Sequence, residues 1–402
     1  MTEQSILGRV ALGYSPIVDT NRNIRATRLG VFPMTAEAKL DAPGLLKAIG
    51  EVWPAQGAQV FLNLGSEELV VDLLAAKPAK NLLVEVPAFM AGEPAMAAAM
   101  AAAHANGNGL LLKGRPSKPL PREILPYFKH AIVDLSEERR VNSAVPLGVT
   151  RTITIVQSGV NNVADMEKSF ARGAVAVLGW PIDDAVTMAA GKDKGKVPTN
   201  VQLIAQLMRQ VDAEESTAKL EATLKRDPTL AFQVLRLINS PALGLKVEVS
   251  SIGHAVMLLG HKRLKRWLAL LLPTATREPN LRPILFASVR RGFLMEELGR
   301  ASGDDEMRSE MFICGVFSLL DRLFQKPIST LLASIPVPQR VREALVKDSG
   351  PFAPYMSLVN ALESGSPLDM RAASDALKMG VAEVNRALLR ALTEATQLDY
   401  GS

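Results

Sequence analysis

The chain has 402 residues, 48% of them hydrophobic and 22% charged, which excludes an intrinsically disordered protein and allows two or three domains. One cysteine excludes an intramolecular disulfide and a cysteine-cluster metal site, and four scattered histidines argue against a histidine metal site. Lys and Arg number 46 against 41 Asp and Glu, a net charge of +5 that is too small to predict nucleic-acid binding.

The sequence also gives no sign of a membrane or secreted protein. It contains no run of about eighteen uncharged apolar residues, so we expect no membrane-spanning helix and no membrane partner. Residues 1–4 lack the basic and apolar regions of a secretory signal. These features predict a soluble protein with a cytoplasmic location.

The first half of the chain alternates short apolar runs with helix-forming stretches. The runs have the length and β-branched content of buried strands, and they occupy residues 60–64, 81–86, 110–112, 131–134 and 153–156. Between them, the alanine-rich stretch 93–105 predicts a closely packed helix. The alternation predicts an α/β architecture, in which a barrel is favoured over an open sheet. No glycine-rich phosphate loop follows these runs, so a nucleotide-binding Rossmann fold is a weak interpretation.

The second half shows helical periodicity only. The charged, glycine-bearing stretch 191–198 has the composition of a linker, so the expected domains are 1–190 and 199–402. The first predicted helix begins at Thr199 or Asn200, and the Asp227-Pro228 pair predicts the start of another that ends near residue 239. Further helices are expected at residues 252–259, 261–271, 283–302, 307–324, 338–346, 356–364, 369–379 and 381–396. The second domain is therefore predicted to be all-α.

Three segments of this half carry a family resemblance. They read LKRDP at 224–228 running into VLRLINS at 234–240, SSIGHAVMLLG at 250–260 and CGVFSLLD at 314–321. Together they resemble the HDOD domain, the metal-free relative of the HD-type phosphohydrolases. In those enzymes the last segment reads A-G-L-L-H-D-I-G, and its His and Asp bind the catalytic metals. Ser318 and Leu319 fall on these two positions here, and the earlier stretch 286–291 lacks the expected histidine, so the resemblance implies a domain without metal or hydrolysis.

The first half resembles a degenerate EAL domain, the barrel that hydrolyses cyclic di-guanylate with two metal ions. Its opening motif survives as SPIVD at 15–19, but Arg28 stands where the family has a metal-binding glutamate. Three further positions still match oxygen ligands of the family, and these are Asn63, Glu85 and Asp134. Lys113 replaces the first of two paired aspartates. Because this half is short for the family, the resemblance implies an incomplete TIM-like barrel that no longer binds metal.

Fused EAL and HDOD domains occur in bacterial regulatory proteins, and this resemblance gives the leading hypothesis for function. It implies a non-enzymatic signal-transduction protein, without cofactors, that binds another signalling protein and is linked to cyclic di-guanylate control of motility or biofilm formation. The alternative is a metal-independent cyclic di-guanylate receptor in which Arg28 and Lys113 neutralise the phosphates. A third hypothesis, residual phosphodiesterase activity, requires metal ligands that are largely missing.

Several polar features allow a functional and a structural interpretation. The densest basic cluster contains Lys262, Arg263, Lys265 and Arg266, and it is either a partner-binding surface or a solvated helix face. Asn63, Glu85 and Asp134 either remain as a ligand site or stabilise strand ends. Trp180, before Pro181, either stacks on a purine or packs a domain junction.

Overall fold

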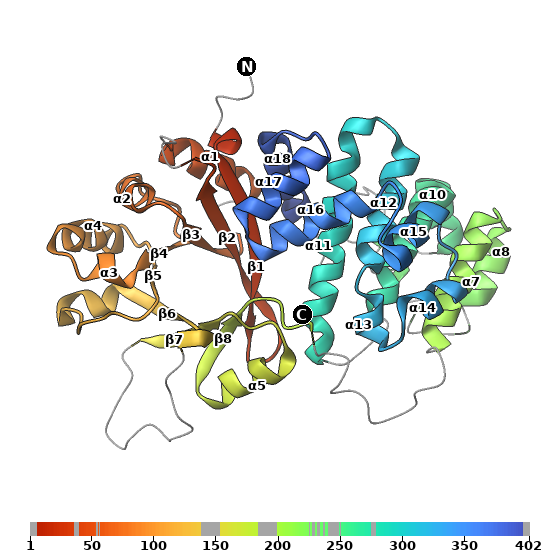
Figure 1. Ribbon diagram of the computed structural model, residues 1–402. Coiled ribbons are helices and arrows are strands. Elements are labelled where there is room, and N and C mark those ends of the chain that lie inside the picture. Colours follow the sequence, from red (N-terminus) through yellow and green to blue (C-terminus); the bar gives the residue numbers. More distant parts are fainter. Residues whose placement is uncertain are drawn as a thin grey trace. The chain divides into compact units, whose positions relative to one another are not determined.

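The computed structural model describes most of the chain as two compact units (Figure 1). The described residues are 6–35, 40–53, 55, 57–137, 153–183, 199–224, 226, 230, 234–235, 238–239, 249, 251–274 and 279–396. The first unit combines Met1–Asp184 with Asn360–Arg386, and the second combines Ala185–Val359 with Ala387–Ser402. This division differs from the expected domains 1–190 and 199–402. The expected linker at 191–198 lies outside the described residues.

The first unit contains a closed barrel of eight strands arranged in chain order. The strands are β1 Val10–Asp19, β2 Ile24–Pro33, β3 Gln59–Leu64, β4 Leu82–Pro87, β5 Leu110–Lys113, β6 Phe128–Asp134, β7 Thr154–Ser158 and β8 Ala174–Leu178. Strand β1 is antiparallel to both of its neighbours, and the other adjacent strands are parallel. The structure confirms the α/β barrel prediction. The prediction of an incomplete barrel is wrong for the sheet, because all eight strands close.

The helices between the strands follow the local sequence signals. They are α1 Ala42–Val52, α2 Glu67–Ala75, α3 Ala88–Ala91, α4 Pro94–Ala105 and α5 Val163–Ala171. The alanine-rich stretch forms α4, as predicted, and begins at a proline, which fits the first turn of a helix. Asn162 begins α5 by accepting a hydrogen bond from the Asp165 amide at 2.7 Å. Between β5 and β6 the structure has only a 3-10 helix, Arg122–Tyr127.

Strand β1 has a partly open edge, and residues from the end of the chain cover it. It pairs with β8 only over Ile17–Asp19, which leaves the edge near Val10 and Leu12 without a neighbouring strand. Asn385 fills this gap and is fully buried. Its Nδ2 donates to the carbonyl oxygens of Leu7 and Val10, both at 2.7 Å, and its Oδ1 accepts the Leu12 amide at 3.2 Å. The Asn385 side chain therefore makes hydrogen bonds that a neighbouring strand would otherwise provide to this edge.

The same C-terminal segment approaches β1 at two more points. The Tyr14 hydroxyl donates to Glu363 Oε1 at 3.2 Å, and Trp180 Nε1 donates to the Glu363 carbonyl oxygen at 3.2 Å. A methyl group at Gly13 would lie 2.8 Å from the Gly365 Cα, so the two backbones need a glycine there. These contacts explain why residues 360–386 belong to the barrel unit. They also place Trp180 in packing, edge to face with Tyr14 at 5.4 Å between ring centroids.

The end of α16 Ala353–Ser364, all of α17 Pro367–Ala376 and the start of α18 Val381–Thr396 supply this segment, while the described helices between residues 199 and 347 belong to the second unit. Those are α7 Thr199–Asp212, α8 Thr217–Leu224, α10 Ile252–Thr274, α11 Arg282–Leu298, α12 Asp305–Phe317, α13 Leu320–Phe324, α14 Ile328–Ser334 and α15 Gln339–Lys347. The all-α prediction is confirmed, and α10 breaks at Gly260 (φ 73°), between the two helices expected there. Most of the helix predicted at 227–239 lies outside the described residues.

Helices α11 and α12 pack closely against each other. A methyl group at Gly315 would lie 2.3 Å from the Arg291 carbonyl oxygen, so the two helix backbones nearly touch. Phe293 and Phe312 pack edge to face at 5.3 Å between ring centroids. Among the residues described, every helix is too short or too polar to span a lipid bilayer.

Candidate functional site

The barrel interior contains a polar layer directly beyond its apolar core. The core includes Ala26, Phe61, Leu83, Leu111, Ile132 and Val156, one residue from each of six strands. Because side chains two residues apart in a strand share a face, the next inward positions are Arg28, Asn63, Glu85, Lys113, Asp134 and Ser158. We call these six residues the charged layer. It contains all five positions that the EAL resemblance singled out, and it lies toward the carboxyl ends of the parallel strands, where barrel enzymes place their active sites.

An ion pair inside the charged layer joins Arg28 to Glu85. Arg28 Nε donates to Glu85 Oε1 at 2.7 Å, and Nη2 donates to Oε2 at 2.6 Å. The Glu85 side chain is fully buried, whereas the Arg28 side chain is 20% exposed. This two-pronged geometry is the strongest that an arginine and a carboxylate can make. Both carboxylate oxygens of Glu85 are consequently engaged by a protein cation.

Lys113 makes the second cation contact of the layer. Its Nζ donates to Asn63 Oδ1 at 2.7 Å, and Asn63 is buried. Burial lowers the pKa of Lys113, the Arg28 charge lowers it further, and the Glu85 charge opposes both. The two residues that match oxygen ligands of the EAL family, Asn63 and Glu85, thus both accept hydrogen bonds from cationic side chains.

Asp134 is held by its own strand end and by the neighbouring strand. Its carboxylate accepts from the Ser136 amide at 3.0 Å, the Ser136 hydroxyl at 2.6 Å and the Ser158 hydroxyl at 3.2 Å. Burial alone would raise the pKa of Asp134, but these hydrogen bonds and the Arg28 charge together lower it. Asp134 is therefore an ionised residue that stabilises a strand end. Within the described residues, no group of three or more His, Cys, Asp and Glu side chains is placed to hold a metal ion.

In the helical unit, the two HD positions lie where a helix ends. A continuous helix was predicted over 307–324, but α12 ends at Phe317 and α13 begins at Leu320. The Ser318 hydroxyl donates to the Gly315 carbonyl oxygen at 2.7 Å and accepts from Arg291 Nη1 at 3.2 Å, while Leu319 is buried. Arg291 lies in the stretch 286–291, where an HD enzyme has a histidine. A cationic side chain therefore contacts Ser318, as cationic side chains contact Glu85 and Asn63 in the barrel.

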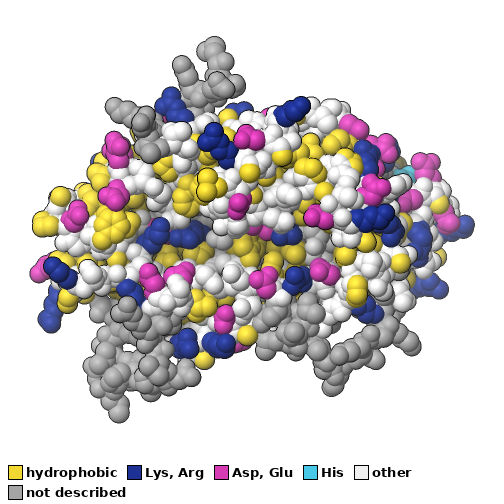
Figure 2. Space-filling model, viewed as in Figure 1, with side chains coloured by type: hydrophobic (Ala, Val, Ile, Leu, Met, Phe, Trp, Pro, Cys, Tyr) yellow, Lys and Arg dark blue, Asp and Glu magenta, His cyan; other side chains and the backbone are white. Residues whose placement is uncertain are grey.

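The predicted basic cluster is largely paired within the protein. Lys265 Nζ lies 2.6 Å from Asp212 Oδ2, Arg266 Nη1 donates to Glu296 Oε1 at 2.7 Å, and Lys262 Nζ is 3.9 Å from Glu306. The Arg266 guanidinium also lies 4.3 Å from the Phe312 ring centroid. Arg263 is exposed. Basic and acidic side chains are interspersed over the visible face (Figure 2), as such pairing requires.

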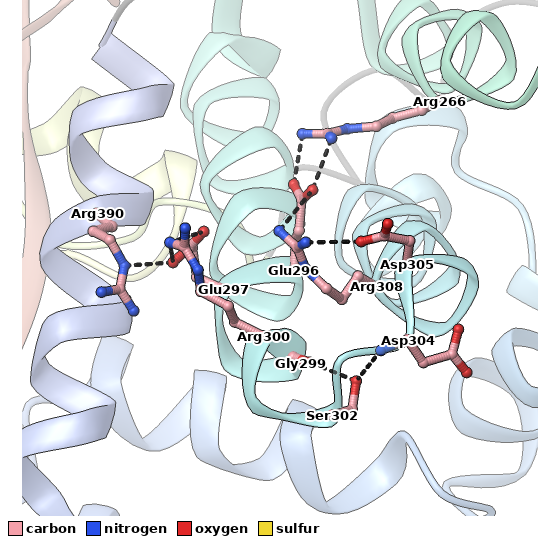
Figure 3. A network of polar contacts seen from close by, with 10 residues as sticks. All are labelled: Arg266, Glu296, Glu297, Gly299, Arg300, Ser302, Asp304, Asp305, Arg308 and Arg390. Atoms are coloured by element: carbon pink, nitrogen blue, oxygen red, sulfur yellow. Dashed lines mark hydrogen bonds and ion pairs between the residues drawn. The ribbon is translucent and has the colours of Figure 1, made fainter. Parts of the chain in front are cut away.

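A polar network around two adjacent glutamates of α11 was missed by the sequence analysis (Figure 3). Glu296 lies between Arg266 and Arg308, and the Arg308–Glu296 distance is 3.7 Å. Glu297, on the next position, pairs with Arg300 at 3.0 Å and with Arg390 at 2.5 Å. Two neighbouring glutamates in a helix carry no signal of burial, because their partners come from other helices.

Burial raises the pKa of Glu296 from 4.5 to about 7; Glu394 and Glu297 add to this shift, and Arg266 and Arg308 oppose it. Between pH 4.5 and about 7 the Glu296 carboxyl keeps its proton in the folded protein and releases it in the unfolded protein. The stability that this protonation provides is therefore lost as the pH rises through about 7. We expect the free energy of unfolding to fall between about pH 5 and 7.5. Denaturant titrations across this range should show a flatter profile for Glu296→Gln, and identical profiles would contradict the assignment.

Comparison with known proteins identifies part of the helical unit. Residues 197–325 match the HDOD domain family. The HDOD segment covers about a third of the chain and contains Ser318 and Leu319. Two related proteins are the uncharacterized protein YuxH of Bacillus subtilis, 29% identical over 165 residues, and the cyclic di-GMP phosphodiesterase CdgJ of Vibrio cholerae, 24% identical over 159 residues. The matches cover 40% and 39% of this chain and only 40% and 37% of those relatives.

Solved structures give weaker likenesses. BlrP1 of Klebsiella pneumoniae, in a calcium and cyclic di-GMP complex, is 18% identical with a TM-score of 0.33, covering 45% of this chain and 57% of that chain. A standalone EAL protein of Vibrio cholerae, bound to cyclic di-GMP, is 13% identical with a TM-score of 0.30, covering 42% and 89%. TM-scores below 0.5 are too low to establish a shared fold.

Proposed function

We propose that this protein is a non-enzymatic component of cyclic di-guanylate signalling, in which the barrel and helical units present surfaces to another signalling protein. The HDOD match and the similarity to CdgJ support the link to this signalling system. The observation that carries the non-enzymatic part is the Arg28–Glu85 ion pair, because it occupies both oxygens of a residue that would have to bind metal.

The charges of the layer oppose a two-metal centre. Such a centre needs several oxygen ligands converging on two divalent ions about 4 Å apart. Here a divalent ion at Glu85 would have to displace the Arg28 guanidinium and remain near the Lys113 ammonium, at a Coulombic cost that burial increases. Ser318 and Leu319 offer no alternative centre in the helical unit, since a hydroxyl is a poor ligand and an isobutyl group is none.

One feature favours a second function, a cyclic di-guanylate receptor that works without metal. Arg28 is partly exposed and Lys113 lies in the same layer, so two cations are available to pair with the two phosphates of the ligand. For this function Arg28 would have to exchange Glu85 for a phosphate. The receptor therefore predicts binding that is weakened by Lys113→Gln and independent of divalent ions.

Calorimetry of the full chain with cyclic di-guanylate separates these functions when it is run in chelator and again with magnesium. We expect no heat of binding in either buffer and no hydrolysis of the ligand, because the candidate metal ligands are paired with cations. Saturable binding in chelator would support the receptor instead. Magnesium-dependent hydrolysis would overturn the non-enzymatic proposal. The Arg28→Glu/Lys113→Asp variant, which restores two acidic side chains, is the matched control for metal uptake.

A further inference from the structure

The helical unit has a cavity of about 870 Å³ that the charged layer and the HD positions do not explain. Its walls come from the C-terminal end of α7, the basic part of α10, the first turns of α12, two residues of α11 and one residue of α18. The lining contains seven Asp or Glu and five Lys or Arg side chains. A volume of this size suits a short peptide segment better than a single ion.

The basic side chains of this cavity mostly contact neighbouring carboxylates. Lys265 pairs with Asp212, Arg266 with Glu296, and Arg308 with Asp305 at 3.1 Å. Lys262 pairs more loosely with Glu306, and Arg263 is exposed to solvent. An acidic partner would therefore have to break existing ion pairs to use this wall. The basic cluster on its own does not make the cavity attractive to anions.

Glu394 is a partly buried carboxylate of this cavity for which the described residues provide no direct ion pair. It lines the cavity from α18, is partly buried, and makes no hydrogen bond or ion pair with the part of the chain that the structure describes. Burial raises the pKa of Glu394 and the Glu297 charge raises it further, whereas the Arg266, Arg300 and Arg308 charges lower it. A partly buried anion without a partner gains most from a cation placed beside it.

We propose that this cavity receives a lysine or arginine side chain of a partner protein, with its charge against Glu394. The apolar residues Val211, Ile313 and Pro338 also line the cavity and can pack against the methylene stem of such a side chain. This inference rests on the proposed function, because it names the chemistry of the partner. In the sequence, the partner-binding surface considered was the basic cluster, whereas here the contact with the partner is a carboxylate.

The test uses the 402-residue chain and three blocked, fluorescently labelled peptides, which are tetra-arginine, its neutral isostere tetra-citrulline, and tetra-glutamate. We expect tetra-arginine to bind more tightly than tetra-citrulline, and tetra-glutamate not to bind. Glu394→Gln should weaken tetra-arginine binding at least tenfold. Glu68→Gln, which removes the same charge from an exposed position on α2 in the barrel unit, should leave it unchanged. Melting temperatures confirm that each variant is folded.

If Glu394→Gln and Glu68→Gln weakened tetra-arginine binding equally, the cation site would be overturned. Preferential binding of tetra-glutamate would overturn it as well. A second variant, Glu394→Lys, places a cation at the site from within the chain and should abolish the peptide binding. Failure of tetra-arginine to bind the wild-type protein would also reject this inference. None of these results bears on cyclic di-guanylate calorimetry, so the cation site and the proposed function can fail separately.

Discussion

Arg28→Ala is expected to lower the free energy of unfolding by about 3 kcal/mol, because it leaves the fully buried Glu85 carboxylate without a counter-charge. The partial exposure of Arg28 keeps the loss below the largest values seen for buried pairs, since water can reach the vacated space. Urea denaturation of the wild-type and variant proteins measures this difference directly.

Strand β2 contains a matched control for this variant. Arg25 also pairs with an aspartate, Asp19, but its side chain is 63% exposed. Arg25→Ala should therefore cost less than about 1 kcal/mol. The Arg28→Met/Glu85→Leu double variant removes both charges together and should recover most of the lost stability. If Arg28→Ala and Arg25→Ala were equally mild, the ion pair would not be a structural element of the barrel.

Asn385→Ala is the second variant with a large expected effect, also about 3 kcal/mol, because it removes three hydrogen bonds to backbone groups at and just before the open edge of β1. Thermal or urea unfolding should show the loss. Asn162→Ala, which removes the side-chain cap of α5, is the control and should cost about 1 kcal/mol. A loss at Asn385 no larger than that at Asn162 would mean that solvent satisfies the β1 edge as well as the side chain does.

The sequence predicted those parts of the fold that local patterns determine. Apolar runs located β3 to β7, and helical periodicity located most helices of the second unit, including the break at Gly260. Strands β1 and β2 were missed because Gly, Ser, Pro and Arg interrupt their apolar residues, and their pairing along nearly their whole length becomes visible only in the folded hairpin. The return of residues 360–386 to the barrel could not be predicted, since helical periodicity does not identify what a helix packs against.

The candidate site shows the same limit. Family resemblance selected Arg28, Asn63, Glu85, Lys113 and Asp134, and strand alternation places all five in one layer. Their pairing could not be read from the sequence, because Arg28 and Glu85 are 57 positions apart and no local rule connects them. Glu394 and the cavity that it lines were missed for the same reason. From the sequence, charged residues were assigned to the surface according to their neighbours along the chain. The burial and the ion-pair partners of such a residue depend instead on helices that are distant in the sequence.

The position of Asn385 near the end of the chain has a consequence for biosynthesis. The strands of the barrel are complete at residue 178, but the side chain that covers the β1 edge is translated about two hundred residues later. At about 5–20 residues per second, the edge at Val10 and Leu12 stays uncovered for on the order of ten seconds or longer. An unpaired strand edge in a nascent chain can pair with other chains. Newly made barrels are therefore expected to depend on chaperones until residue 385 has been translated, and truncated chains that lack residues 360–386 should aggregate.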